Sequence, residues 1–376
     1  MNKAGLYLHI PFCLKKCGYC DFYSITRLEK QNDFIAALIK EIVLLSPQYR
    51  QLEFDTIYLG GGTPSLLSTQ QLETIWINIQ NYFTISAPGE FSIEANPGTI
   101  DLEKLAALRQ LGFNRLSLGV QSFAETDLKF LGRIHSVHEI YDGFTAARQA
   151  GFDNINIDLI SAFPGLTTER FRNTLQKVTE LRPEHISCYT LIFEPNTPFF
   201  RRLKLGELQA LTADEEAAFI EITDQELRKA GYTAYEISNY ALSTDYFCRH
   251  NLKYWEHQPY LGLGPSAHSF ISPRRWKNHR SVTKYIHFLK NESLPIAQQE
   301  TLNTSDLEFE YIFLHLRLKE GLNLVDFQDR FQTDFTEKYR IPLEKLDEAG
   351  MINFYDQQLK LSDRGWLLAD EVSSYF

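Results

Sequence analysis

The first two hundred residues alternate short β-rich runs with segments of helical periodicity. Phe34, Leu38, Ile42 and Leu45 recur at helical spacing, and Ser68 is a favourable N-cap residue for a second helical segment. Six strands that alternate with helices predict a parallel sheet with right-handed crossovers, either an open sheet or a partial barrel. We expect the strands at residues 6–12, 56–60, 90–95, 115–120, 154–160 and 185–191.

Polar residues follow or close these predicted strands. Cys13 begins a cysteine-rich segment after the first strand, and a glycine triplet that includes Gly61 follows the second. Glu94, Gln121 and Asp158 stand at or near the ends of the next three strands. Ligands of parallel α/β sheets gather at the carboxyl ends of the strands. We therefore expect these residues to share one rim of the sheet.

The pattern changes after about residue 212. A long charged helix is predicted over residues 214–230, and a β-rich run follows at 233–240. The aromatic-rich region at 248–270 has the character of a loop. We therefore predict a barrel domain at 1–212, a barrel extension at 213–300 and a C-terminal domain at 301–376.

The C-terminal segment predicts a compact, mainly helical domain. Ser305 or Asp306 is the expected N-cap of its first helix. Two shorter helices and a hairpin at 352–361 complete an arrangement that resembles a winged helix. Four apolar residues of the first helix are expected to point inward: Phe309, Ile312, Phe313 and Leu316.

The overall charge limits the partners of the chain. Among 376 residues, 48 Asp and Glu outweigh 38 Lys and Arg, which gives a net charge of −10. Such a field repels phosphates and argues against nucleic acid as a partner, although a local basic patch is compatible with it. We find no signal peptide and no apolar stretch long enough to span a membrane. We therefore expect a cytoplasmic protein, with peripheral membrane contact left open.

Three of the five cysteines, Cys13, Cys17 and Cys20, lie within eight positions. An odd total with this clustering suits metal ligands better than disulfides. Three such thiolates can each bind one iron of a 4Fe–4S cluster and leave the fourth iron without a protein ligand. That iron can take the amino and carboxylate groups of S-adenosylmethionine (SAM), which an electron from the cluster then cleaves to a radical. A zinc site, another structural site and chance clustering are the alternatives.

The sequence around the cysteines resembles a family of radical SAM proteins that includes oxygen-independent coproporphyrinogen III oxidase and the heme chaperones. The resemblance implies a partial (β/α) barrel of six strands that opens onto the cluster, in agreement with the strand count above. It rests on the segment from Tyr7 to Phe22 and on residues 60–64 (GGGTP), 92–97 (SIEANP), 119–123 (GVQSF), 132–135 (GRIH) and 156–160 (NIDLI).

The resemblance also implies a SAM site. Gly61, Gly62 and Thr63 would hold the methionyl amine, in a turn where glycine lets the backbone approach a ligand closely. The guanidinium of Arg133 would bind the methionyl carboxylate. The other matched positions are Gln121 and Asp158 at the nucleoside, Glu94 as a further SAM-contacting carboxylate, and Tyr7 and Tyr19 close to SAM.

Each of these residues also has a structural interpretation. A glycine triplet is often only a tight turn, and a single arginine often forms a surface ion pair. Glu94 and Asp158 could form structural salt bridges, although an unpaired buried carboxylate costs several kcal/mol. Tyr7 and Tyr19 could fill the core.

A second motif, HNxxYW, runs from His250 to Trp255. It resembles the corresponding segment of the heme chaperones. A histidine can ligate heme iron, and Tyr254 and Trp255 offer flat apolar area to a porphyrin. In the alternative, His250 hydrogen-bonds the loop and the aromatic residues close the barrel.

Two features separate the branches of the family. The oxidase carries a fourth cysteine two residues after the third, where this chain has Phe22, and it has a longer segment ahead of Tyr7. Both features favour a heme chaperone that passes heme to acceptor proteins and draws on an electron donor for its cluster. Coproporphyrinogen III oxidation is the alternative. A radical SAM enzyme that modifies RNA is a third possibility, and the acidic charge argues against it.

Overall fold

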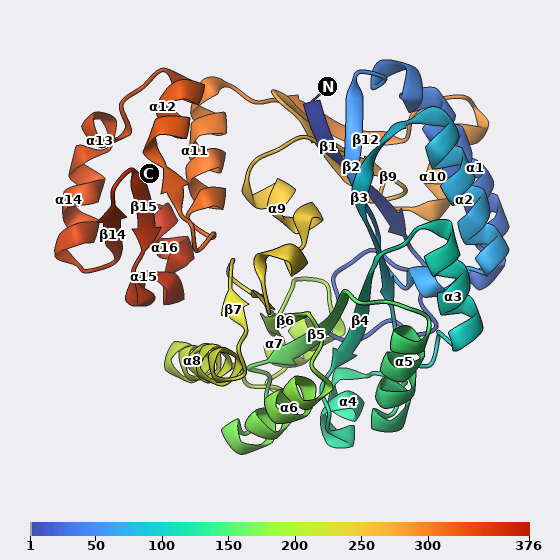
Figure 1. Cartoon of the computed structure of the whole chain (residues 1–376), viewed down its shortest axis with the longest axis horizontal. Coiled ribbons are helices and arrows are strands. Elements are labelled where there is room, and N and C mark those ends of the chain that lie inside the picture. Colours follow the sequence, from blue (N-terminus) through green and yellow to red (C-terminus); the bar gives the residue numbers. More distant parts are fainter. Residues whose placement is uncertain (1) are drawn as a thin grey trace.

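The structure is a computed structural model and describes residues 2–376. Six strands form its centre and lie side by side in chain order (Figure 1). Every neighbouring pair among them is parallel, so their carboxyl ends meet at one edge of the sheet. The strands are β1 (Asn2–Ile10), β2 (Leu52–Gly61), β3 (Thr84–Ala95), β4 (Arg115–Gln121), β5 (Ile155–Ser161) and β6 (His185–Thr190).

All six predicted strands are confirmed, and the largest differences lie at their starts. β2 begins at Leu52 and β3 at Thr84, earlier than expected. The early part of β3 contains Pro88 and Gly89, residues that normally argue against a strand interior. The predicted partial barrel is also confirmed: β7 and β12 are the two outer strands of the sheet, which stays open between them.

Helices connect the six strands and cover the outer face of the sheet (Figure 1). Phe34, Leu38, Ile42 and Leu45 are all buried in α1, as their spacing predicts, and Ser68 caps α2 in a capping box. The helices are α1 (Gln31–Leu45), α2 (Thr69–Tyr82), α3 (Leu102–Leu111), α4 (Glu125–Leu131), α5 (Val137–Gln149) and α6 (Thr168–Leu181), with short 3₁₀ turns η1 (Leu28–Lys30), η2 (Ser46–Gln48) and η3 (Pro64–Leu66).

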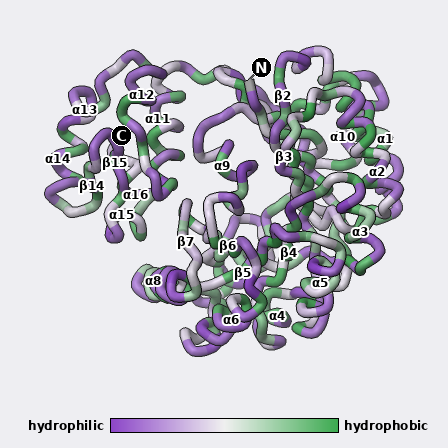
Figure 2. The backbone as a smooth tube through the Cα atoms, viewed as in Figure 1, coloured by the Kyte–Doolittle hydropathy of each residue, from purple (hydrophilic) through white to green (hydrophobic). Residues whose placement is uncertain are grey.

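Further elements follow β6. Helix α7 (Pro198–Lys204) is short, whereas α8 (Ala213–Lys229) matches the predicted charged helix and is largely hydrophilic (Figure 2). The predicted β-rich run forms two small strands, β7 (Thr233–Ala234) and β8 (Asn239–Ala241), and β8 adds antiparallel to β6. One more 3₁₀ turn, η4 (Thr244–Tyr246), comes next.

The prediction of a loop at 248–270 is wrong. This region holds helix α9 (Arg249–Trp255) and strand β9 (Tyr260–Leu263), which pairs parallel to β1, and it runs into β10 (His268–Ile271). Two more antiparallel strands, β11 (Arg274–Asn278) and β12 (Ile296–Thr301), complete a sheet of twelve, with α10 (Val282–Lys290) between them. These four strands are only four to six residues long, so they show too little apolar alternation to reveal them in the sequence.

The C-terminal segment forms a small domain with its own three-stranded sheet, at the left of Figure 1. The predicted hairpin is confirmed as β14 (Ile352–Tyr355) and β15 (Gln358–Leu361). Three short helices precede it instead of two. The remaining elements are α11 (Thr304–His315), β13 (Leu322–Asn323), α12 (Leu324–Phe331), α13 (Phe335–Lys338), α14 (Arg340–Glu348), α15 (Asp363–Leu367) and α16 (Ala369–Ser373).

Two predictions for α11 are wrong. Its N-cap is Asn303, whose side chain accepts from the Asp306 N–H at 3.0 Å, while the Asp306 carboxylate accepts from the Asn303 N–H at 3.1 Å. Asp306 thus completes the capping box but is not the cap. Phe309 is 43% exposed and does not point inward. The buried face of the helix carries Tyr311 and Ile312.

Buried apolar side chains form two clusters. The first extends from Ala4 to Leu289 and fills the space between the large sheet and its helices. The second extends from Tyr311 to Val372 and forms the core of the C-terminal domain. Because the first cluster spans residue 212, the boundary predicted there stays a prediction. None of the helices in residues 2–376 combines the length and the hydropathy that a bilayer crossing requires.

Candidate functional site

The three clustered cysteines lie on the loop that leaves the carboxyl end of β1. All three thiols are free and partly buried, and they line one space, the cluster cavity, together with Thr63 and Arg133. The Thr63 hydroxyl donates to the Cys13 sulfur at 3.7 Å, and the Arg133 guanidinium donates to the Cys17 sulfur at 3.7 Å.

Burial raises the pKa of the Cys20 thiol to about 11. Metal binding requires the thiolate, and a bound metal supplies the positive charge that favours it. Within residues 2–376, no group of three His, Cys, Asp or Glu side chains gathers closely enough to hold a single metal ion. Three sulfurs that line one cavity, with hydrogen-bond donors directed at two of them, fit the donor set of a 4Fe–4S cluster.

The glycine turn after β2 packs directly against the cysteine loop. A Cβ at Gly62 would lie 2.7 Å from the Phe12 carbonyl oxygen and 2.8 Å from that of Ile10, so only glycine fits there. Gly61 has a φ of +106°, in the left-handed region. The N–H groups of Gly61, Gly62 and Thr63 donate to Glu94, Ile10 and Phe12, respectively. An ammonium ligand at this turn would therefore meet oxygen acceptors.

Two partly exposed carboxylates of the site lie on β3 and β5. Glu94 on β3 accepts from the Tyr58 hydroxyl and from the Gly61 N–H, both at 3.0 Å. Desolvation and, to a smaller extent, the nearby Asp158 raise its pKa to about 7. Asp158 on β5 accepts from Ser117 at 3.0 Å and from Asn156 at 2.8 Å, and burial raises its pKa as well. Neither carboxylate forms the structural salt bridge that we considered as an alternative.

Arg133 reaches the same edge from the segment after α4. Its guanidinium donates to the Gly119 carbonyl oxygen at 2.8 Å and to the Asn96 side chain. It is held by neutral oxygens and does not form the surface ion pair considered above. Asn96 also donates to the Thr63 hydroxyl at 2.9 Å, so it links the glycine turn to Arg133. Sequence reasoning assigned no role to Asn96, although it closes β3 next to Glu94.

A cavity of about 550 Å³, here called the mouth cavity, opens at this edge. Its volume falls within the usual range for small-molecule sites, about 300–1,000 Å³. One side is polar and the other carries apolar side chains, of which Phe22 is 68% and Ile192 66% exposed. The predicted residues that line it are Tyr19, Cys20, Gly61, Gly62, Thr63, Glu94, Gln121, Arg133 and Asp158, and the apolar residues include Phe22, Ile160, Tyr189, Leu191 and Ile192.

Gln121 and the two tyrosines differ in their positions. Gln121 has a left-handed φ of +71° at the end of β4 and lines the cavity. The Tyr19 ring contacts Phe199 edge-on, with centroids 6.1 Å apart. Tyr7 is not among the lining residues: its hydroxyl hydrogen-bonds His9 at 3.0 Å and its ring stacks on Tyr58. The structure thus brings Gln121 and Tyr19 to the mouth cavity and places Tyr7 beneath it.

His250 lies on α9, near the opposite end of the barrel. Its side chain is 1% exposed, and burial lowers its pKa to about 3. Nδ1 hydrogen-bonds the Thr56 hydroxyl at 2.8 Å, and Nε2 hydrogen-bonds the Tyr254 hydroxyl at 2.9 Å. Both ring nitrogens therefore have protein partners. The cluster cavity and the mouth cavity do not include this residue.

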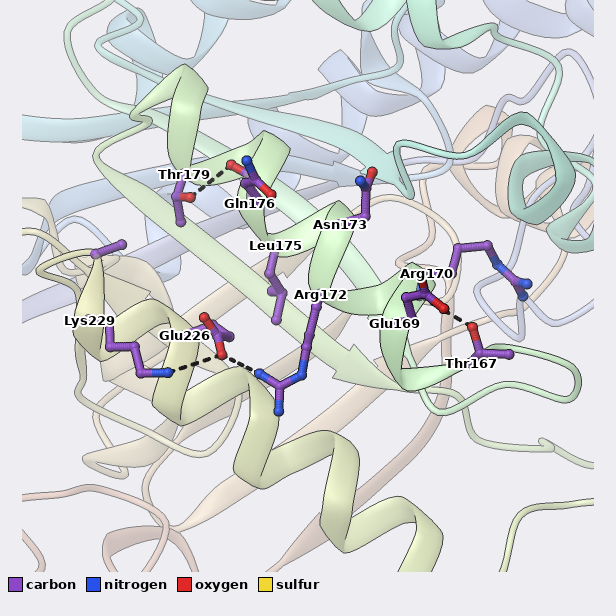
Figure 3. A pocket seen from close by; sticks show the side chains of 11 residues that line it. Thr167, Glu169, Arg170, Arg172, Asn173, Leu175, Gln176, Thr179, Glu226 and Lys229 are labelled. Atoms are coloured by element: carbon purple, nitrogen blue, oxygen red, sulfur yellow. Dashed lines mark hydrogen bonds and ion pairs between the residues drawn. The ribbon is translucent and has the colours of Figure 1, made fainter.

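A separate hollow of about 790 Å³ lies between α6 and α8 (Figure 3). There Glu226 pairs with Arg172 and accepts from Lys229 at 3.2 Å. None of the predicted site residues lines this hollow, so it is distinct from the candidate site.

Comparison with known proteins agrees with this geometry. Residues 7–178 match the radical SAM superfamily, and residues 302–368 match the HemN C-terminal domain. The chain is 35% identical to the heme chaperone HemW of Lactococcus lactis over 98% of this chain and 96% of the relative. It is 33% identical to the heme chaperone HemW of Bacillus subtilis over 98% of each.

The chain belongs to the HemW family. The cysteine loop and the glycine turn both lie within the segment that matches the radical SAM superfamily, for which a 4Fe–4S cluster and SAM are the implied cofactors. Among solved structures, coproporphyrinogen III oxidase (HemN) of Escherichia coli, described as a radical SAM enzyme, aligns with a TM-score of 0.88. The two are 26% identical, and the alignment covers 100% of this HemW-family chain and 90% of HemN.

Proposed function

We propose that this chain is a heme chaperone that binds heme and passes it to heme-accepting proteins in the cytoplasm. The observation that carries the proposal is the similarity along nearly the whole chain to relatives named heme chaperone HemW in several bacteria. The side chain at the position after Asp21 supports it: the chain has Phe22, an apolar group on the rim of the mouth cavity, where the oxidase branch carries a cysteine.

In this proposal Cys13, Cys17 and Cys20 hold the 4Fe–4S cluster. A bound cluster of this type supplies an electron to SAM. Gly61, Gly62 and Thr63 would hold the methionyl amine through backbone carbonyl oxygens, Arg133 would donate to the carboxylate, and Gln121 and Asp158 would bind the nucleoside. Glu94 supplies a further negative charge toward the cationic cofactor, with Tyr19 beside it and Tyr7 below. Asn96 holds Arg133 and Thr63 in place through its two hydrogen bonds.

The iron ligand is the part of the proposal that needs the sharpest test. His250 is the candidate, and heme iron can reach its Nε2 only when the Tyr254 hydroxyl gives way. A pair of variants separates the possibilities. If His250 is the ligand, His250→Ala weakens heme binding, and Tyr254→Phe, which frees Nε2, strengthens it. If neither variant changes the affinity or the heme absorption spectrum, the ligand lies elsewhere and the His250 assignment is wrong.

Heme titration tests the function itself. Purified protein, with and without reconstituted cluster, is titrated with heme, and the loaded protein is then mixed with an apo-form heme acceptor. We expect binding of one heme per chain and transfer to the acceptor. Failure to bind heme stoichiometrically, with an intact cluster, would contradict the proposal.

The second candidate is coproporphyrinogen III oxidation, favoured by the overall similarity to the HemN structure. An anaerobic assay with SAM, a reductant and coproporphyrinogen III decides between the two. Appearance of protoporphyrinogen would favour the oxidase, whereas an intact substrate together with heme binding would favour the chaperone.

A further inference from the structure

Two segments next to the cluster cavity are basic, although the chain as a whole is acidic. The cysteine loop at residues 13–20 contains Lys15 and Lys16, and α7 contains Arg201, Arg202 and Lys204. Neither segment contains an Asp or a Glu, whereas the whole chain has a net charge of −10. We call these five cations, together with the neighbouring Leu14, the basic patch.

The two segments are in direct contact. The Phe199 N–H of α7 donates to the Gly18 carbonyl oxygen at 2.9 Å. A Cβ at Gly18 would lie 2.7 Å from the Phe199 ring, so the close approach requires glycine. Phe199 is buried and also packs against Tyr19 of the cysteine loop. Helix α7 therefore holds its cations at a fixed place beside the loop that carries the thiols.

The cations of the basic patch are available to a partner. Among the salt bridges in residues 2–376, Arg202 pairs with Glu207 at 3.4 Å, but none involves Lys15, Lys16, Arg201 or Lys204. Leu14 is 50% exposed and lines the cluster cavity together with Lys15 and Lys16. These three residues therefore lie both at the cluster cavity and at the protein surface. An apolar centre with a charged rim is typical of a protein–protein contact.

We propose that the basic patch is the docking surface for a small acidic electron-carrier protein that reduces the cluster. Opposite charges steer such a carrier to the patch, and because Leu14, Lys15 and Lys16 line the cluster cavity, a carrier docked there lies next to the cluster. One electron passes from the reduced carrier to the oxidised cluster, and no bond is made or broken. The proposal requires the cluster that the family implies, but it does not require heme transfer.

Charge reversal tests the docking surface. Full-length protein with reconstituted cluster is mixed anaerobically with reduced flavodoxin, and the bleaching of the cluster is followed by stopped flow at several salt concentrations. We expect the triple variant Lys15→Glu, Arg201→Glu, Lys204→Glu to react about tenfold or more slowly at low salt and to lose the salt dependence of the wild type. Calorimetry with oxidised flavodoxin should show a matching loss of affinity.

Matched controls keep the result interpretable. The triple variant Lys284→Glu, Lys290→Glu, Lys345→Glu changes the net charge equally on α10 and α14, away from α7, and should behave as the wild type. Photoreduced deazariboflavin, a small carrier without a docking surface, should reduce the cluster of all three proteins equally. Equal slowing with both reductants, or no slowing with flavodoxin, would overturn the proposal. So would a loss of heme binding with unchanged cluster reduction, which would assign the patch to the heme propionates.

Discussion

Both ends of the barrel carry carboxylates, but the surroundings of these carboxylates differ between the two ends. At the amino end, Glu90 accepts from the N–H groups of Arg249 and His250, each at 3.0 Å, and Asp55 pairs with Lys253 at 2.7 Å. At the carboxyl end, Glu94 and Asp158 face a cavity. At the amino end, here called the closed end, α9 itself supplies the partners of Glu90 and Asp55, whereas at the carboxyl end, the open end, Glu94 and Asp158 accept hydrogen bonds from the protein and also line a cavity.

The contrast shows how a buried polar group can be assigned to structure or to ligand binding. Hydrogen bonds that saturate a side chain stabilise the fold and leave nothing for a ligand. Desolvation raises the pKa of Glu94 to about 7, which means that its charged form is unfavourable in the free protein. A cationic ligand can offset this cost of desolvation. By this criterion the HNxxYW helix belongs to the closed end and the GGGTP and SIEANP segments belong to the open one.

Removing a cluster thiol should give the largest effect at the open end. We expect Cys13→Ala, Cys17→Ala or Cys20→Ala to abolish the brown absorbance of anaerobically reconstituted protein, because a cluster held by three thiolates tolerates the loss of one poorly. Iron and sulfide analysis measures the outcome. Cys188→Ala, at a buried cysteine of β6, is the control and should keep its cluster. Full iron content in all the loop variants would contradict the assignment of these three cysteines as cluster ligands.

Substitution of Glu90, at the closed end, should lower the stability of the protein. Glu90→Gln keeps the shape of the side chain but leaves one of the α9 N–H groups without its acceptor, so we expect the free energy of unfolding to fall by about 2 kcal/mol. Denaturant unfolding of the ligand-free protein measures this change. SAM affinity should stay near that of the wild type. If Glu90→Gln leaves the stability unchanged, the hydrogen bonds from α9 to Glu90 do not stabilise the closed end.

The matched substitution Glu94→Gln, at the open end, should weaken SAM binding and raise the stability of the protein at high pH. Because its folded pKa of about 7 lies above the ordinary value of 4.5 for a glutamate, Glu94 contributes stability below pH 4.5 that is lost as the pH rises through 7. Glu94→Gln should therefore flatten this fall in stability and unfold less readily than wild type at pH 8. We expect SAM affinity to drop about tenfold, or roughly 1.4 kcal/mol. Equal SAM affinity in the two proteins would contradict the role of Glu94.

The smallest expected effect concerns His250. Thr56→Val removes the partner of Nδ1, so we expect a loss of about 1 kcal/mol in the free energy of unfolding and no change in SAM affinity. Ser117→Ala, which removes a hydrogen bond to Asp158, is the companion variant at the open end and should weaken SAM binding slightly instead. If the two variants behave alike, the distinction between the ends does not hold.

The sequence predicted the centre of the fold better than its edges. Buried parallel strands are continuous apolar runs, so β1 and β4 to β6 could be placed within a few residues. Strand β12 has only exposed or partly exposed side chains, and α9 is too short to show a period. Likewise the cap of α11 was misplaced because several polar residues in a row could serve, and only the folded backbone selects Asn303.

For the site, sequence reasoning identified the thiols and most of the polar rim, because strand ends converge in this class of sheet. It placed Asn96 at this rim but gave it no role, because that role depends on the fold bringing Thr63 and Arg133 to either side of it. It could not settle His250, because a histidine written in a motif does not reveal that both of its nitrogens are already bonded.

The pairing of β1 has a consequence for how the chain is made. This first strand lies between β2 and β9, and its partner residues in β9, Tyr260–Leu263, are synthesised long after the cysteines. At a usual translation rate of about 5–20 residues per second, the thiols leave the ribosome tens of seconds before the strand that braces them exists. The cysteine loop therefore precedes one of the two strands that flank β1, so we expect a metal centre at these thiols to assemble only after β9 has been made.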